Sequence, residues 1–195
     1  MIMKATLSQL NQTFKTGFGE VYNGDYNKGY EEGYDSGRDI AASIIDRSVT
    51  DIVIPDGVTS IGDCAFCYCS NLKSIVIPNS VTSIGKQAFC YCTSLKSITL
   101  PDSVTTVNAS AFEYCSSLET VTFGKNINYI SSYAFGSCTN ISVYDFSRCT
   151  KVPTLPYANA IRFATGGQIL VPASLYDEWI NATNWAGFAY CTVAV

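Results

Sequence analysis

The residues best suited to chemistry in this chain are its nine cysteines. Cys64 and Cys67 form a Cys-x-x-Cys pair, a spacing found in redox dithiols and in zinc sites. Cys69, Cys90 and Cys92 follow within about one further repeat of the sequence. Three interpretations are open: reduced structural thiols, a disulfide, or a metal site. We favour reduced structural thiols, because a buried thiol behaves as a small apolar side chain, and we expect any exception at Cys67 and Cys90.

Other catalytic chemistry finds little support in the sequence. The chain contains no histidine, which removes the usual general base near neutral pH and the commonest metal ligand. The carboxylate pairs Glu31-Glu32 and Asp177-Glu178 are sequence neighbours, and no pattern places two carboxylates across a cleft. Gly166-Gly167 lacks the spacing of a phosphate-binding loop. We therefore expect no enzyme, no cofactor and no bound metal; a redox or metal protein that uses Cys64 and Cys67 is the weakest hypothesis.

Composition narrows the remaining classes of protein. A hydrophobic content of 47% with 14% charged residues excludes a disordered chain. The net charge of −4 and the lack of a basic patch predict that nucleic acid is not the partner. There is no apolar run of about 18 residues, so we expect no membrane insertion. The first ten residues also lack the apolar stretch of a secretory signal, so the sequence predicts no export by that route.

Four of the nine cysteines belong to one column of a sequence repeat that must position them. An Ala-Phe pair, a cysteine and an aliphatic residue each recur at a constant step of 23 residues. A period of roughly 20–50 residues is typical of a solenoid. The three columns are Ala65-Phe66, Ala88-Phe89, Ala111-Phe112 and Ala134-Phe135; Cys69, Cys92, Cys115 and Cys138; and Leu72, Leu95, Leu118 and Ile141.

Each repeat predicts one short strand and a return path. The strands are expected within 49–54, 72–77, 95–100 and 118–123, where apolar residues at the first, fourth and sixth positions point inward. Proline ends the first three strands, because it cannot donate to a strand ladder. The Ala-Phe pair is expected in a short helical or irregular turn on the far side, with the cysteine column beside turning backbone carbonyls. Stacked repeats would form a parallel sheet with a rise of about 4.8 Å.

The repeat carries a family resemblance. The pattern Ile-Pro-x-x-Val-Thr-x-Ile-Gly-x-x-Ala-Phe-x-x-Cys-x-x-Leu-x-x-Ile resembles the BspA-type leucine-rich repeat of bacterial surface proteins. The copies at 54–76 and 77–99 match it nearly in full, whereas the copy at 123–145 departs from it. The resemblance implies an α/β-type leucine-rich-repeat solenoid with parallel strands on one face. It also implies cell-surface or extracellular proteins that contact host or neighbouring-cell partners.

We divide the chain into three parts. Residues 1–48 are a Tyr/Gly-rich leader that is partly helical or flexible, 49–146 are the repeats, and 147–195 are a non-repeat C-terminal cap. Within the cap we expect a helix over 175–179, capped by Ser174. Both tryptophans lie in this part, and we expect them to cover the end of the solenoid core.

The leader has its own periodicity. Tyrosine recurs every four residues at Tyr22, Tyr26, Tyr30 and Tyr34, beside glycines at the same step. This spacing places side chains on one helical face, while the glycines oppose helix formation. Two interpretations remain: a passive leader whose tyrosines pack locally, or an assembly segment that makes a homo-oligomer through residues 1–39.

The outward strand positions form the candidate binding surface. They are polar, of mixed charge and without an aromatic cluster, so a solvated face and a weak binding face are both open. We favour a non-enzymatic interaction or adhesion module with a protein or glycan partner. The alternative is a structural component of a phage or prophage particle whose leader mediates assembly. The candidate residues are Lys73, Ser74, Val76, Lys96, Ser97, Thr99, Glu119, Thr120 and Thr122.

Overall fold

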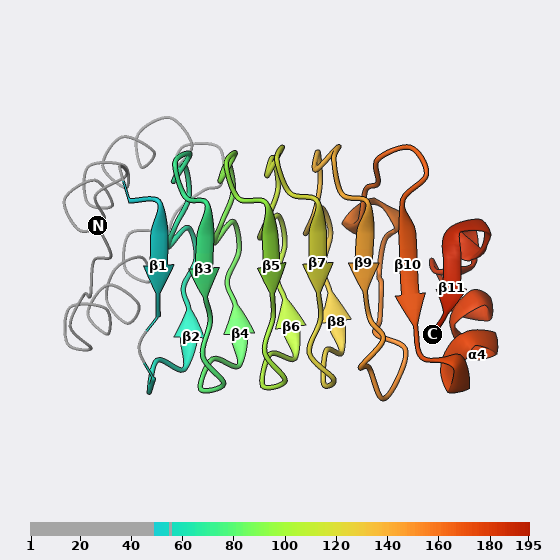
Figure 1. Ribbon diagram of the computed structural model, residues 1–195. Helices are drawn as coiled ribbons and strands as arrows, with labels where there is room; N and C mark the ends of the chain where they lie inside the picture. Colours follow the sequence, from blue (N-terminus) through green and yellow to red (C-terminus); the bar gives the residue numbers. More distant parts are fainter. Residues whose placement is uncertain (1–48, 55) are drawn as a thin grey trace, which may run out of the picture.

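The computed structural model describes residues 49–54 and 56–195. These residues form an elongated solenoid in which successive coils of the chain stack side by side (Figure 1). The predicted solenoid is therefore confirmed. The predictions for the leader, residues 1–48, fall outside the described residues.

One row of strands runs along a single side of the solenoid. Neighbouring strands of the two sheets in this row pair in parallel, and from β1 to β9 each residue lies opposite the residue 23 positions away, as Thr120 does with Ser97 and Val143. β1 and β3 form one sheet, and β5, β7, β9, β10 and β11 form another. We call the outward surface of β1, β3, β5, β7 and β9 the strand face. The row comprises β1 (Asp51–Val53), β3 (Ser74–Val76), β5 (Ser97–Thr99), β7 (Thr120–Thr122), β9 (Val143–Asp145), β10 (Gln168–Val171) and β11 (Thr192–Ala194).

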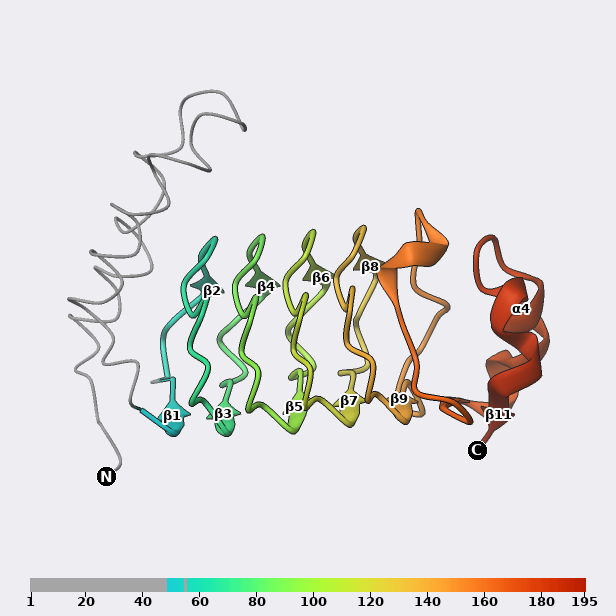
Figure 2. The ribbon, with the colours of Figure 1, turned by 90° about the horizontal axis from the view of Figure 1, so that it is seen from above.

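A second, narrower row of strands carries the chain away from the strand face (Figure 2). The turn between the two rows starts at the predicted prolines, since the Val81 and Val104 amides donate to the carbonyls of Pro78 and Pro101 at 3.1 Å. The proline thus ends one strand and supplies the acceptor for the turn that follows. The second row comprises β2 (Ser60–Ile61), β4 (Ser83–Ile84), β6 (Thr106–Val107) and β8 (Tyr129–Ile130), paired in parallel.

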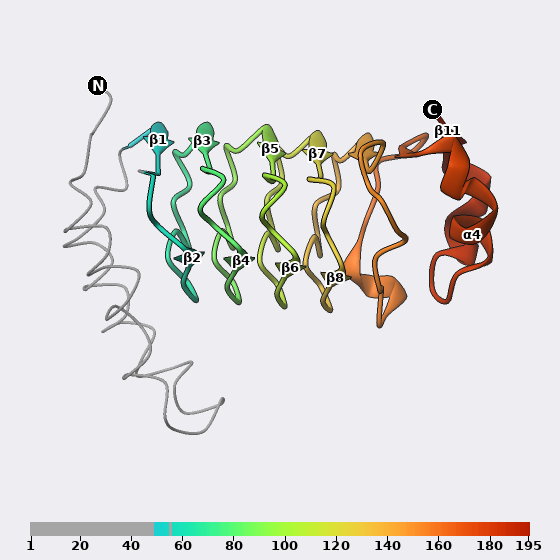
Figure 3. The same ribbon diagram turned by 90° about the horizontal axis from the view of Figure 1, so that it is seen from below.

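The third side of each coil is a turn that returns toward the strand face (Figure 3). We call residues 63–70, 86–93, 109–116 and 132–139 the turn edge. Of the two predicted forms, the irregular turn is confirmed: no regular helix occurs there. The turns bond to one another through alternate amides, as in Phe66 N–H to Ala88 O at 2.7 Å and Tyr68 N–H to Cys90 O at 2.8 Å. Several non-glycine residues here have positive φ, including Cys64 at 54° and Tyr68 at 62°.

The core lies between these three sides and is built from the repeated columns. Phe66, Phe89, Phe112 and Phe135 are each at most 1% exposed and stack with ring centroids 4.9–5.2 Å apart. One coil has no partner for this column within itself, so the ring is buried only when the next coil stacks on it. Stacking therefore provides most of the apolar burial.

The C-terminal part closes around two tryptophans. Trp179 and Trp185 are buried against Phe146, with ring centroids 5.1 and 5.4 Å away, and Trp185 Nε1 donates to Pro153 O at 2.7 Å. The elements here are η1 (Ala158–Ala160), η2 (Ala173–Leu175), α4 (Tyr176–Asn181) and η3 (Ala186–Cys191).

The prediction that Ser174 caps the helix is wrong. Ser174 lies inside η2, the N-cap residue of α4 is Leu175, and no side chain bonds to that helix start. The 3₁₀ turn runs directly into α4, and the Tyr176 amide donates to Ala173 O. The backbone of the preceding turn thereby satisfies a donor that a serine hydroxyl would otherwise have served.

Candidate functional site

The predicted binding residues all lie on the strand face. Lys73, Lys96 and Glu119 directly precede β3, β5 and β7, and the other six residues lie within these strands. Seven of the nine are exposed; Thr120 and Thr122 are half-buried. The residues between them point inward: Ile75, Ile98 and Val121 are buried. The alternation follows from the two-residue period of a strand.

Register aligns the outward side chains into columns. Ser97, Thr120 and Val143 lie opposite one another, and so do Thr99, Thr122 and Asp145. Parallel strands stand about 4.8 Å apart, so the side chains of one column are immediate neighbours. On β5 and β7 the face therefore presents short hydroxyl side chains beside the charged residues Lys96 and Glu119.

The two ends of the strand face differ in polarity. Val53 and Val76 are 49% and 56% exposed at the first two rungs. In the same column the later rungs carry Thr99, Thr122 and Asp145. The two valines form a small exposed apolar contact beside charged residues.

A carboxylate beside the valines is already bonded. Thr50 Oγ1 donates to Asp51 Oδ2 at 2.7 Å, and Ser74 Oγ donates to Asp51 Oδ1. The Ser74 bond is the main cause that lowers the pKa of Asp51, followed by the Thr50 bond. Asp51 therefore stays ionised at neutral pH.

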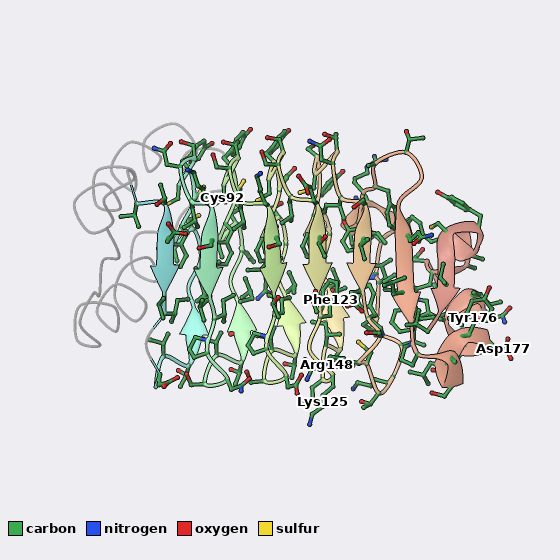
Figure 4. The ribbon with its side chains drawn as sticks, in the orientation of Figure 1. Cys92, Phe123, Lys125, Arg148, Tyr176 and Asp177 are labelled. Atoms are coloured by element: carbon green, nitrogen blue, oxygen red, sulfur yellow. The ribbon has the colours of Figure 1, made fainter. Side chains whose placement is uncertain are left out.

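A second charged group lies where the chain turns below the strands (Figure 4). Arg148 Nη2 lies 2.8 Å from Asp102 Oδ2, and Lys125 Nζ lies 4.0 Å from the same oxygen. The Asp102 carboxylate also accepts the Lys125 amide at 3.1 Å. These groups satisfy one another across the coils, so the cluster stabilises the array and makes a weaker candidate for recognition.

The column cysteines occupy the predicted place beside turning carbonyls. Their thiols donate to phenylalanine carbonyls one coil earlier: Cys92 to Phe66 O at 3.2 Å and Cys115 to Phe89 O at 3.1 Å. Desolvation raises the pKa of both thiols. Among the described residues, no group of three His, Cys, Asp or Glu side chains has the arrangement of a metal site.

Sequence reasoning missed an aromatic column on the turn edge. Tyr68, Tyr91 and Tyr114 stack with ring centroids 4.6 and 4.5 Å apart, and Tyr114 is 41% exposed. The next equivalent position is Ser137, so the stack ends there. Their recurrence at 23 residues was visible in the sequence. This recurrence could have predicted the tyrosine column.

A pocket of about 520 Å³ near the C-terminus was also missed. Phe163, Gly167, Tyr190 and Val193 are among the residues that line it, from the loop before β10 and from η3 and β11. Its walls are mainly backbone and apolar side chains, and no charged group lines it. No repeat signals this pocket, because it forms where the 23-residue period has ended.

The candidate assembly residues Tyr22, Tyr26, Tyr30 and Tyr34 lie outside the described residues, so their role stays a prediction. In the described part of the chain, no helix has the length and apolar character needed to cross a membrane.

Comparison with known families identifies the repeat family. A model described as the BspA type leucine-rich repeat region matches residues 45–162 in six copies. The chain belongs to the BspA-type leucine-rich repeat family. The match extends beyond the range 49–146 on both sides, and the division into leader, repeats and cap remains a prediction. No curated protein matches the chain.

Solved structures place this BspA-type chain among bacterial leucine-rich repeat proteins. It is 27% identical to the leucine-rich repeat protein of T. pallidum, with a TM-score of 0.55 over 64% of this chain and 60% of that one. A leucine-rich repeat protein from Eubacterium ventriosum is 24% identical, with a TM-score of 0.54 over 63% of this chain and 32% of that one. The pneumococcal vaccine antigen PcpA is 19% identical, with a TM-score of 0.59 over 75% of this chain and 34% of that one.

These likenesses support a protein-interaction module. The leucine-rich repeat family is one of binding modules that are typically not enzymes. The chain spans 60% of the T. pallidum protein and about a third of the other two. The two likenesses below 25% identity show the fold alone.

Proposed function

We propose that this BspA-type solenoid is a non-enzymatic adhesion module that binds a protein partner through the strand face. The observation that carries the proposal is the exposure of in-register outward columns, with Val53 and Val76 at one end and Lys73, Lys96 and Glu119 beside the strands. The BspA-type resemblance adds an expectation of partners on host or neighbouring cells.

Contact through this face is expected to be weak for a single copy. It has no aromatic hot spot, and its side chains are short apart from the charged row. Several copies displayed together raise the effective concentration of the second and later contacts, and so gain avidity without new contacts. Adhesion by clustered copies suits such a face.

The test uses the full chain, displayed in clusters on fluorescent beads and offered to epithelial cells and to immobilised matrix proteins. A variant with Lys73→Ala, Lys96→Ala and Glu119→Ala removes the charged row. Its matched control, Lys86→Ala, Lys151→Ala and Glu178→Ala, removes the same exposed charges elsewhere. We expect the first variant to lose binding at least ~10-fold and the control to retain it. Equal binding by both variants would refute the proposal that the strand face binds the partner.

The partner class is separated by treating the target. Mild protease treatment of the target surface should abolish binding of the wild-type beads, whereas removal of glycans should leave it. The reverse pattern would identify a glycan partner on the same face.

The second candidate is a component of a phage or prophage particle. The four-residue tyrosine pattern favours it, because tyrosine-rich stretches make good contact surfaces. Light scattering on the full chain is expected to give a trimer or larger under this alternative. Replacing Tyr22, Tyr26, Tyr30 and Tyr34 together by serine should then give a monomer. A monomeric wild type would remove this candidate.

A further inference from the structure

Three cysteines gather on the turn edge apart from the buried column. Cys64 and Cys67 lie in one turn and are half-buried; Cys90 lies in the next turn and is 4% exposed. Cys64 Sγ donates to Gln87 Oε1 at 3.6 Å, and the thiols of Cys64 and Cys90 are the neighbours that act most strongly on the Cys67 thiol. The column thiols differ, because those of Cys92 and Cys115 donate to backbone carbonyls.

The backbone holds Cys64 and Cys67 at the two ends of one tight turn. The Cys67 amide donates to Cys64 O at 3.0 Å, which closes a four-residue turn. Such a turn holds its end Cα atoms within about 7 Å, and a disulfide requires about 4.4–6.8 Å. The positive φ of Cys64, 54°, is part of this turn.

The two thiols also differ in acidity: the pKa of Cys64 is lowered, and the pKa of Cys67 is raised. The hydrogen bond from Cys67 is the main cause that lowers the pKa of Cys64, although burial and Asp63 oppose it. The bonds to Cys64 and Cys90, followed by burial, raise the pKa of Cys67. The half-buried Cys64 is accordingly the thiol that ionises first and meets a reagent from solvent.

We propose that Cys64 and Cys67 are a redox-responsive dithiol, oxidised to an intramolecular disulfide by a small-molecule disulfide of the glutathione class. The Cys64 thiolate attacks one sulfur of the reagent, which forms a mixed disulfide and releases one thiolate. The Cys67 sulfur, losing its proton to solvent, then attacks Cys64 and expels the second thiolate. Two protein thiols are oxidised, and one reagent disulfide is reduced to two thiols.

Cys90 is excluded as the first nucleophile by its burial. It borders Cys67 in the neighbouring turn and remains a thiol in the product. The proposal concerns a modification site and does not depend on which partner the strand face binds.

The full-length protein tests this inference directly. It is reduced, freed of reductant, exposed to oxidised glutathione, denatured and alkylated, and then weighed by mass spectrometry. We expect two of the nine thiols to resist alkylation, with no added glutathione mass, and peptide mapping to join Cys64 to Cys67. Nine alkylated thiols, a covalent dimer, or a disulfide between any other pair would overturn the assignment.

Single variants sharpen the result without depending on each other. Cys64→Ser should abolish the protected pair. Cys90→Ser should keep it. Cys191→Ser, which alters another half-buried thiol, is the matched control and should also keep it. Should Cys64→Ser leave two thiols protected, the dithiol would have to lie elsewhere, and the proposal fails.

Discussion

The strand face and the turn edge are built from the same 23-residue repeat, yet they tolerate sequence change differently. At the turn edge, phenylalanine occupies all four core positions, and the rings stack at 4.9–5.2 Å. On the strand face, the position before each strand changes from Lys73 and Lys96 to Glu119 and Ser142. A side chain that touches its own copy in the next coil must fit that copy. An outward side chain meets mainly solvent and is free to vary.

This contrast separates stability from recognition. The repeated columns that identify the family are buried and hold the coils together. They include Phe112 and Cys115. The columns that vary, such as Lys96 and Thr99, are exposed and are available to a partner. The repeat therefore identifies the fold, while under the proposed function the partner is selected by residues that the repeat does not specify.

The largest loss of stability is expected where a core side chain of the turn edge is removed. Phe112 is fully buried and stacks on both Phe89 and Phe135. Phe112→Ala should lower the free energy of unfolding by about 3–5 kcal/mol, because it removes apolar contacts and leaves a cavity. Urea denaturation measures the loss. Thr99→Ala on the strand face is the control, and a loss as large there would contradict the distinction.

A smaller effect is expected where two coils approach at a glycine. A Cβ on Gly124 would lie 2.3 Å from Pro101 O, a backbone atom that cannot move alone. Gly124→Ala should cost about 1–3 kcal/mol through overpacking. Gly187→Ala is the matched control, since nothing lies within 4 Å of a Cβ there. Equal thermal denaturation of the two variants would show that the coils are not in close contact.

Alkaline pH should weaken the fold through a buried thiol. Burial raises the pKa of Cys149 from 9.0 to about 12. The folded state holds this proton more tightly than the unfolded state, so the stabilisation is complete below pH 9 and is lost as pH rises toward 12. Urea denaturation between pH 8 and 11 should show a decline that Cys149→Ala reduces. A decline of unchanged steepness in the variant would assign it to other groups.

The sequence predicted most of the repeat for a physical reason. Periodic burial fixes the period, so the inward positions such as Ile98 and the site of Cys92 beside Phe66 O follow from spacing alone. It failed at Ser174, because local capping competes with a preceding 3₁₀ turn that has no pattern of its own. The C-terminal pocket forms between Phe163 and Tyr190, which no period relates.

The exposure of the candidate residues could be predicted from the sequence, but the molecule that they bind could not. The alternation that exposes Ser97 and Thr99 was predictable, because the strand period dictates it. The period does not encode which molecule contacts them, since these side chains are open to solvent and are not buried against the next coil. The tyrosine stack from Tyr68 to Tyr114 was periodic as well.

The central claim, that the strand face recognises and the rest of the repeat stabilises, is tested most directly by measuring one variant in two ways. For Lys73→Ala with Lys96→Ala and Glu119→Ala, cell binding of clustered protein and the free energy of unfolding are compared with those of wild type. We expect binding to fall at least ~10-fold while the free energy of unfolding stays within about 0.5 kcal/mol of the wild-type value. Binding that persists in a variant of unchanged stability would contradict the central claim.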